Sequence, residues 1–197
     1  MSAPTPTPTI ELRFPHTWVA EILAQRPLIL PSRSYIYPQA AEEIERGALE
    51  VLIKPGNNEP NGEGIQPFLA TCALGFRDSS VPSGLWSTPN PGEICAVSGG
   101  YAYLIDTQAP ERFTMLPLRP VMQIAPALEA DLLLFASHHN ILAWGRDGLA
   151  WQSGKLSDEG VTITAIEVDK LHGIGWQMMT DKETPFVLDL KTGKKSA

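Results

Sequence analysis

The sequence is poor in cysteine and has no long apolar run, and each absence excludes a class of protein. Cys72 and Cys95 are too few for the disulfide framework that stabilises small secreted domains. No apolar run approaches the roughly 20 residues that a membrane-spanning helix needs. Met1–Ile10 has neither the basic start nor the apolar centre of a signal peptide. These features predict a cytoplasmic protein without a membrane partner, in which both cysteines are buried thiols in strands.

Basic residues are also scarce relative to acidic ones. The chain has 15 lysines and arginines against 22 aspartates and glutamates, which gives a formal net charge of −7. An acidic surface repels phosphate, so nucleic acid is not an expected partner. The basic cluster Lys191, Lys194 and Lys195 is interpreted as a solvated tail near the C-terminus.

Familiar catalytic and cofactor motifs are missing as well. The sequence has no glycine-rich dinucleotide loop that opens a helix, no G-x-x-x-x-G-K-[ST] phosphate loop and no G-x-S-x-G nucleophile elbow. Ser98–Gly100 joins two predicted strands and is therefore interpreted as a turn. The neighbouring carboxylates Asp158 and Glu159, and Asp181 with Glu183, fall in predicted turns and show no sign of facing each other across a cleft. The sequence therefore predicts no cofactor and favours a protein that is not an enzyme.

Proline and glycine are abundant, at 18 and 16 residues, but prolines are unevenly placed. None occurs between Pro126 and Pro185. A strand inside a sheet donates its backbone N–H groups and avoids proline, so this stretch predicts the centre of an antiparallel sheet. Within it, Leu132–Ala136, Ile141–Trp144 and Leu149–Gln152 predict a three-stranded meander.

A second meander is predicted nearer the C-terminus, from Val161–Ile166, Leu171–Trp176 and Pro185–Leu190. Val161–Ile166 alternates apolar residues with threonine, which is the period-2 pattern of a half-buried strand. The two meanders together make the back half of the chain almost entirely β.

Further strands are predicted in the first half of the chain. Leu49–Ile53 and Pro67–Phe76 are expected to pair across Lys54–Gly64, a mobile loop made almost wholly of turn residues. Cys95–Ser98 is expected to pair with Tyr101–Leu104, because two adjacent glycines between them favour a tight hairpin turn.

The remaining segments predict one edge strand, two helices and two connectors. Ile10–Phe14 alternates apolar and charged residues and predicts a short edge strand. Thr17–Gln25 and Pro38–Arg46 are predicted as short helices, the first capped by its threonine and the second begun by proline and ended by glycine. Arg77–Gly92 and Thr107–Pro126 are predicted as loop-rich connectors.

Three segments of the chain share one pattern: an apolar run, a turn, a second apolar run and a glycine-containing turn. Repeats of this length are typical of blade and array architectures. They are Ile94–Thr107, Leu132–Gly154 and Leu171–Gly193.

The last half of the chain resembles β-propeller blades of the quinoprotein-like kind. No cofactor residue of that family has a matching position, and a closed ring needs about four blades where this chain has room for about three. The residues that carry the resemblance are Trp144, Gly148, Trp151, Asp189, Thr192 and Gly193.

These patterns predict a mainly β fold. The expected architecture is an antiparallel β-meander that forms a sandwich, a partial barrel or a partial propeller, with one or two short N-terminal helices. Met1–Thr9 alternates proline and threonine and predicts a flexible leader. Residues 10–193 are predicted as a single mostly-β domain, followed by a tail at residues 194–197.

Two groups of residues are candidate sites. Adjacent His138 and His139 are a candidate metal pair, for which His172 or His16 would have to supply a third ligand. Aromatic side chains at strand positions are a candidate ligand groove, although such residues more often belong to a core. The aromatic candidates are Trp86, Tyr101, Tyr103, Trp144 and Trp176, with Trp151 beside them.

Two functions follow as hypotheses. The first is a non-catalytic binding or scaffolding module whose partner is another protein or a second copy of the chain, which would also cover open sheet edges. The second is a small metal-dependent hydrolase that uses His138 and His139.

Overall fold

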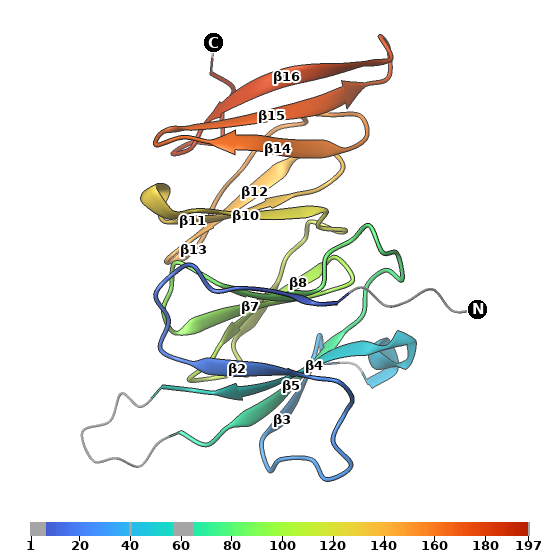
Figure 1. The fold of residues 1–197 in the computed structure, drawn as a ribbon, viewed down its shortest axis with the longest axis vertical. Helices are drawn as coiled ribbons and strands as arrows, with labels where there is room; N and C mark the ends of the chain where they lie inside the picture. The colour runs from blue at the N-terminus through green and yellow to red at the C-terminus, as the bar shows by residue number, and fades with distance from the viewer. Residues whose placement is uncertain (1–6, 40, 57–64, 197) are drawn as a thin grey trace. The chain divides into compact units, whose positions relative to one another are not determined.

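A computed structural model describes residues 7–39, 41–56 and 65–196 of the chain (Figure 1). The described part contains sixteen strands and two short 3-10 turns, and none of it forms an α-helix. The prediction of a mainly β fold is therefore confirmed. Several antiparallel sheets form, and none of them closes into a barrel. Within the described ranges, no helix has the length and apolarity to cross a membrane.

The chain divides into two compact units. Unit 1 comprises Met1–Ser87 and Pro91–Pro117, and unit 2 comprises Thr88–Asn90 and Leu118–Ala197. Each unit contains two sheets, and each pair of sheets shares one hydrophobic core.

Unit 1 has a five-stranded sheet in the order β1-β6-β7-β8-β9 and a four-stranded sheet in the order β2-β4-β5-β3. Most neighbours are antiparallel, but β1 with β6 and β3 with β5 run parallel. The strands are β1 Thr9–Glu11, β2 Val19–Leu23, β3 Ser34–Tyr37, β4 Ala48–Lys54, β5 Phe68–Ala73, β6 Gly84–Ser87, β7 Glu93–Ser98, β8 Tyr101–Asp106 and β9 Phe113–Met115.

The core of unit 1 follows from alternation along its strands. In β4, Leu49, Val51 and Ile53 occupy every second position and all three are buried in the core. Two buried tyrosines hydrogen-bond through their hydroxyl groups: Tyr37 donates to the Pro110 carbonyl at 2.8 Å and Tyr103 donates to the Ala73 carbonyl at 2.9 Å. The core also contains Trp18, Phe68, Ala70, Cys72, Leu85, Ile94, Ala96 and Ile105.

Unit 2 has a four-stranded sheet in the order β10-β11-β12-β13 and a three-stranded sheet in the order β14-β15-β16. All of its strand pairs are antiparallel, so both predicted meanders are confirmed. The strands are β10 Gln123–Ala127, β11 Leu132–Ala136, β12 Ile141–Gly145, β13 Gly148–Gln152, β14 Val161–Ile166, β15 Lys170–Gln177 and β16 Lys182–Asp189.

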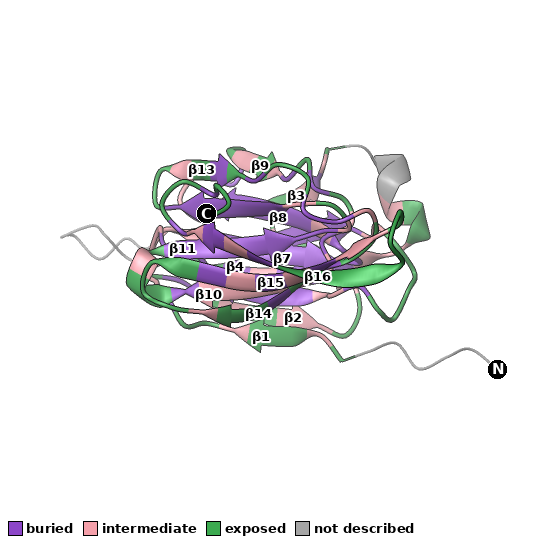
Figure 2. Cartoon of the chain, turned by 90° about the horizontal axis from the view of Figure 1, so that it is seen from above, coloured by how far each residue is buried: buried purple, intermediate pink, exposed green. Residues whose placement is uncertain are grey.

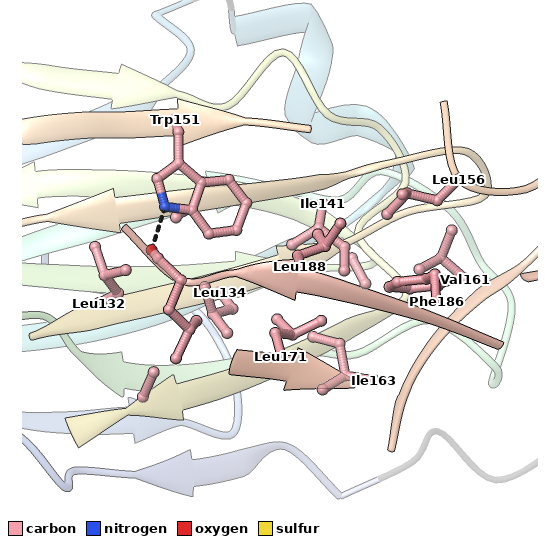
Figure 3. Close-up of a cluster of buried hydrophobic side chains, with 14 residues drawn as sticks. Leu132, Leu134, Ile141, Trp151, Leu156, Val161, Ile163, Leu171, Phe186 and Leu188 are labelled. Atoms are coloured by element: carbon pink, nitrogen blue, oxygen red, sulfur yellow. Dashed lines mark hydrogen bonds between the residues drawn. The ribbon is translucent and has the colours of Figure 1, made fainter. Parts of the chain in front are cut away.

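Side chains from both sheets meet in the core of unit 2 (Figure 3). The Trp151 indole N–H donates to the Leu190 carbonyl oxygen at 2.7 Å, which joins β13 to the residue that follows β16. The other labelled residues of this core are Leu132, Leu134, Ile141, Leu156, Val161, Ile163, Leu171, Phe186 and Leu188.

Both predicted hairpins of unit 1 are confirmed. β7 pairs with β8 across Gly99 and Gly100, whose φ angles of 55° and 76° are left-handed and easily reached only by glycine. β4 pairs with β5 as expected. Residues 57–64, which include most of the predicted loop Lys54–Gly64, lie outside the described residues, as do residues 1–6 of the predicted leader.

The two predicted N-terminal helices are wrong. Within Thr17–Gln25 the chain forms β2, because pairing with β4 over five register positions outweighs a weak helical pattern. Within Pro38–Arg46 only a 3-10 turn forms, Ala41–Arg46. Gln39 has a left-handed φ of 74°, which is incompatible with an α-helix that begins at the proline.

The two predicted connectors also contain strands. Arg77–Gly92 includes β6, and Thr107–Pro126 includes β9 and most of β10. These strands have three to five residues each, and two of them lie at sheet edges. Short strands among turn residues give little periodic signal, and an edge position tolerates Pro126 inside β10.

Candidate functional site

The histidine pair lies in the turn between β11 and β12. The ring centroids of His138 and His139 are 6.3 Å apart with their planes inclined by 53°. Ser137 organises this turn through its hydroxyl group, which accepts the His139 backbone N–H and contacts Asn140. The polar sequence is thus accounted for by local turn chemistry.

The histidines suggested as third metal ligands have neighbours of their own. His16 packs against Trp18 with ring centroids 4.6 Å apart, and Nε2 of His172 lies 3.3 Å from a Glu167 carboxylate oxygen. In the described ranges, no three His, Cys, Asp or Glu side chains gather into a metal-binding group. The metal site at His138 and His139 stays a prediction.

The aromatic candidates in unit 1 occupy three different environments. Tyr103 is completely buried in the core, where no ligand reaches it. Tyr101 is half-buried and its ring meets Phe76 edge-on at 5.8 Å. Trp86 is buried in β6, and its indole N–H donates to the Glu11 carboxylate at 3.2 Å. Through this hydrogen bond the Trp86 side chain contacts β1, the first strand of the chain.

The aromatic candidates in unit 2 are also distinct. Trp144 is buried in β12, and Trp151 belongs to the core. Trp176, in β15, is half-buried, and its indole N–H donates to the exposed Asp181 carboxylate at 3.2 Å. Of these three, Trp176 presents the most surface.

A surface that the sequence interpretation did not select is the segment Pro27–Pro31, here called the apolar loop. Leu28 is fully exposed, Ile29 is 90% exposed and Leu30 is 44% exposed. Three consecutive large aliphatic side chains are seldom exposed on a protein surface, and exposed apolar clusters of this kind commonly mark contact sites. The signal was present in the sequence as an apolar triplet between two prolines.

The C-terminal end of the apolar loop is held firmly. The Ser34 hydroxyl donates to the Pro31 carbonyl at 2.8 Å. The Arg33 guanidinium donates to the Gln66 carbonyl at 2.9 Å and lies 5.8 Å from the Phe68 ring centroid. Since each proline also fixes its own φ, the loop presents its side chains with less conformational freedom than an unrestrained loop would.

Unit 2 carries a smaller apolar projection, here called the methionine tip. Met178 and Met179 lie between β15 and β16, with Met179 93% exposed. The backbone N–H of Met178 donates to Asp158 Oδ2 at 2.8 Å, and Lys155 Nζ lies 2.6 Å from Asp158 Oδ1. The hydrogen bond from Lys155, followed by the one from Met178, lowers the pKa of Asp158 below its ordinary value.

Comparison with models of known protein families and with curated proteins finds no match to this chain.

Proposed function

We propose that this protein is a non-catalytic, β-sheet binding module whose partner is another protein. The observation that supports the proposal is the apolar loop, in which Leu28 and Ile29 stand in water on a segment anchored at its base. Full burial of one such side chain in a partner contributes about 1.5–3 kcal/mol. The restraint by two prolines lowers the entropic cost of that burial.

A protein pocket suits this loop better than a phosphate-rich surface does. The net charge of −7 repels both nucleic acid and anionic bilayers. Small branched aliphatic side chains fit a dry protein pocket of matching shape.

Among the arrangements expected from the sequence, we favour a sandwich for each unit, supported by two sheets that share one core. We also favour the cytoplasm, supported by Cys72 and Cys95, which are both buried and free.

The test compares the full-length wild type with two matched double variants. Leu28→Ser with Ile29→Ser removes the two most exposed side chains of the apolar loop, and Met178→Ser with Met179→Ser removes an exposed apolar pair elsewhere. Each is used for quantitative affinity capture and for light scattering after size exclusion. We expect a protein bound stoichiometrically by the wild type and by the methionine variant, and lost from the loop variant. A wild type that stays monomeric and captures nothing, or a loop variant that retains every partner, contradicts the proposal.

A further inference from the structure

The first strand of unit 1 is an addition to the edge of a sheet formed by residues more than 70 positions later. β1 runs parallel to β6, with Thr9 opposite Gly84 and Glu11 opposite Trp86. The Thr9 backbone N–H donates to the Ser83 carbonyl at 2.9 Å. The Trp86 indole N–H donates to the Glu11 carboxylate at 3.2 Å. An extended peptide is thus seen bound to the outer edge of β6.

The attachment of β1 is shallow. All three residues of β1 lie outside the core of unit 1, and most of this strand has the colour of exposed residues in Figure 2. Ile10 is 57% exposed. The chain becomes anchored only at Phe14, which is buried and whose backbone N–H donates to the Ser87 hydroxyl at 2.8 Å. Leu12 and Arg13, between these two points, are exposed. β1 can therefore leave β6 without displacing Phe14.

The edge of β6, in contrast, is shaped to receive a backbone. Gly84 has a φ of +152°, and a Cβ atom at this position would lie 1.9 Å from the Thr9 carbonyl oxygen. Only glycine combines this backbone conformation with so close an approach. On its other side β6 pairs with β7 over four register positions, and Leu85 belongs to the core of unit 1, so β6 is held in place independently of β1.

From this geometry we infer that the outer edge of β6 is a strand-addition site for a partner protein, occupied here by the chain's own Thr9–Glu11. The partner supplies an extended segment that replaces β1, runs parallel to β6 and places a carboxylate where Glu11 now accepts the Trp86 N–H. Strand addition gains affinity from main-chain hydrogen bonds and specificity from individual side chains. This inference rests on the proposed function, for which it names a partner class, but it uses a surface separate from the apolar loop.

The tethered strand competes with any incoming one. A short tether gives β1 an effective concentration in the millimolar range. A free peptide can bind only those molecules in which β1 has left the edge of β6. Its apparent affinity is therefore lower, the smaller that fraction of molecules is. Weakening β1 in the chain should therefore strengthen the binding of a separate peptide.

The test uses a fluorescent peptide with the sequence of residues 7–13, T-P-T-I-E-L-R, and full-length protein. Thr9→Pro in the protein removes the N–H that donates to Ser83, and Glu11→Lys frees the edge in a second way without changing the backbone. We expect both variants to bind the peptide at least about tenfold more tightly than the wild type by fluorescence anisotropy. Adding Gly84→Ala to either variant should abolish binding, and a peptide with lysine in place of its glutamate should bind weakly.

Hydrogen exchange at residues 9–11 establishes that β1 is released, and far-UV circular dichroism establishes that the sheets persist. The inference is overturned if the Thr9→Pro and Glu11→Lys variants release β1 but do not bind the peptide, or if they bind the lysine-containing peptide equally well. A wild-type dimer held together by exchanged β1 strands overturns it as well, because the occupant would then be a second copy. The Leu28→Ser, Ile29→Ser variant should bind the peptide like its parent, so failure of this test is distinguishable from failure of the apolar-loop proposal.

Discussion

Replacing Trp151 by phenylalanine removes one hydrogen bond from the core of unit 2 while keeping an aromatic ring. The indole N–H donates to the Leu190 carbonyl at 2.7 Å, and both residues are buried. A buried carbonyl that loses its donor costs about 1–3 kcal/mol. Phenylalanine is smaller than tryptophan, so the substitution also leaves a void. The Trp151 ring packs closely against Gly193: a Cβ atom added to Gly193 would lie within 3.0 Å of three atoms of the indole ring. We expect a total loss of about 2–4 kcal/mol in the free energy of unfolding.

Trp176→Phe is the matched control. It deletes the same donor from the same residue type, but the acceptor is the exposed Asp181 carboxylate, which water can satisfy. The expected loss is about 1 kcal/mol or less. Urea unfolding of both full-length variants, followed by far-UV circular dichroism, measures the difference in the free energy of unfolding. If the two units unfold in separate transitions, the transition of unit 2 is analysed by itself. Equal destabilisation by the two substitutions would refute the assignment of Trp151 to a closed, water-free core.

Three further results are expected. The hydrogen bond with Lys155 lowers the pKa of Asp158, so the ionised carboxylate stabilises the fold above its ordinary pKa of 3.8. This stabilisation is lost as the pH falls through the lowered pKa of the folded state, so the difference in stability between the wild type and Asp158→Asn should shrink in acid. Burial raises the pKa of Cys72 and Cys95, so neither thiol should react with a disulfide reagent at pH 8 until the chain is unfolded. If the His138–His139 pair holds a metal, alanine substitution of both should remove a stoichiometric transition metal found by elemental analysis of the wild type, whereas equal metal content in both proteins contradicts the site.

The back half of the fold could be predicted because its information is local. Strands from Val161 onward alternate in period 2, and the absence of proline between Pro126 and Pro185 marks a region whose N–H groups are all needed by ladders. Gly99 and Gly100 define a hairpin by their conformational freedom alone. Each of these signals lies within a few residues of the structure that it produces.

The first half was harder because its decisive partners are distant in sequence. Val19–Leu23 becomes a strand by pairing with β4, about 30 residues later, and no local pattern encodes that pairing. β1 depends on Gly84, whose place beside Thr9 no spacing rule predicts.

The candidate surfaces show the same division between type and environment. Trp86 was selected by residue type, but its role depends on Glu11, 75 positions away. The triplet Leu28–Leu30 was visible as an apolar run, yet whether such a run is covered or exposed depends on what packs over it. Composition identifies residues capable of binding, and tertiary packing decides which of them remain available.

The apolar loop joins β2 and β3, which lie at opposite edges of one sheet, so neither β4 nor β5 contributes to the connection. Insertions between Ala24 and Arg33 would leave every hydrogen bond of those two central strands intact, and doubling the length of such a connection costs only about 0.6 kcal/mol of closure entropy. Evolution, or an engineer grafting a foreign epitope, is therefore free to change the sequence and length of this segment while the sheet beneath it stays the same.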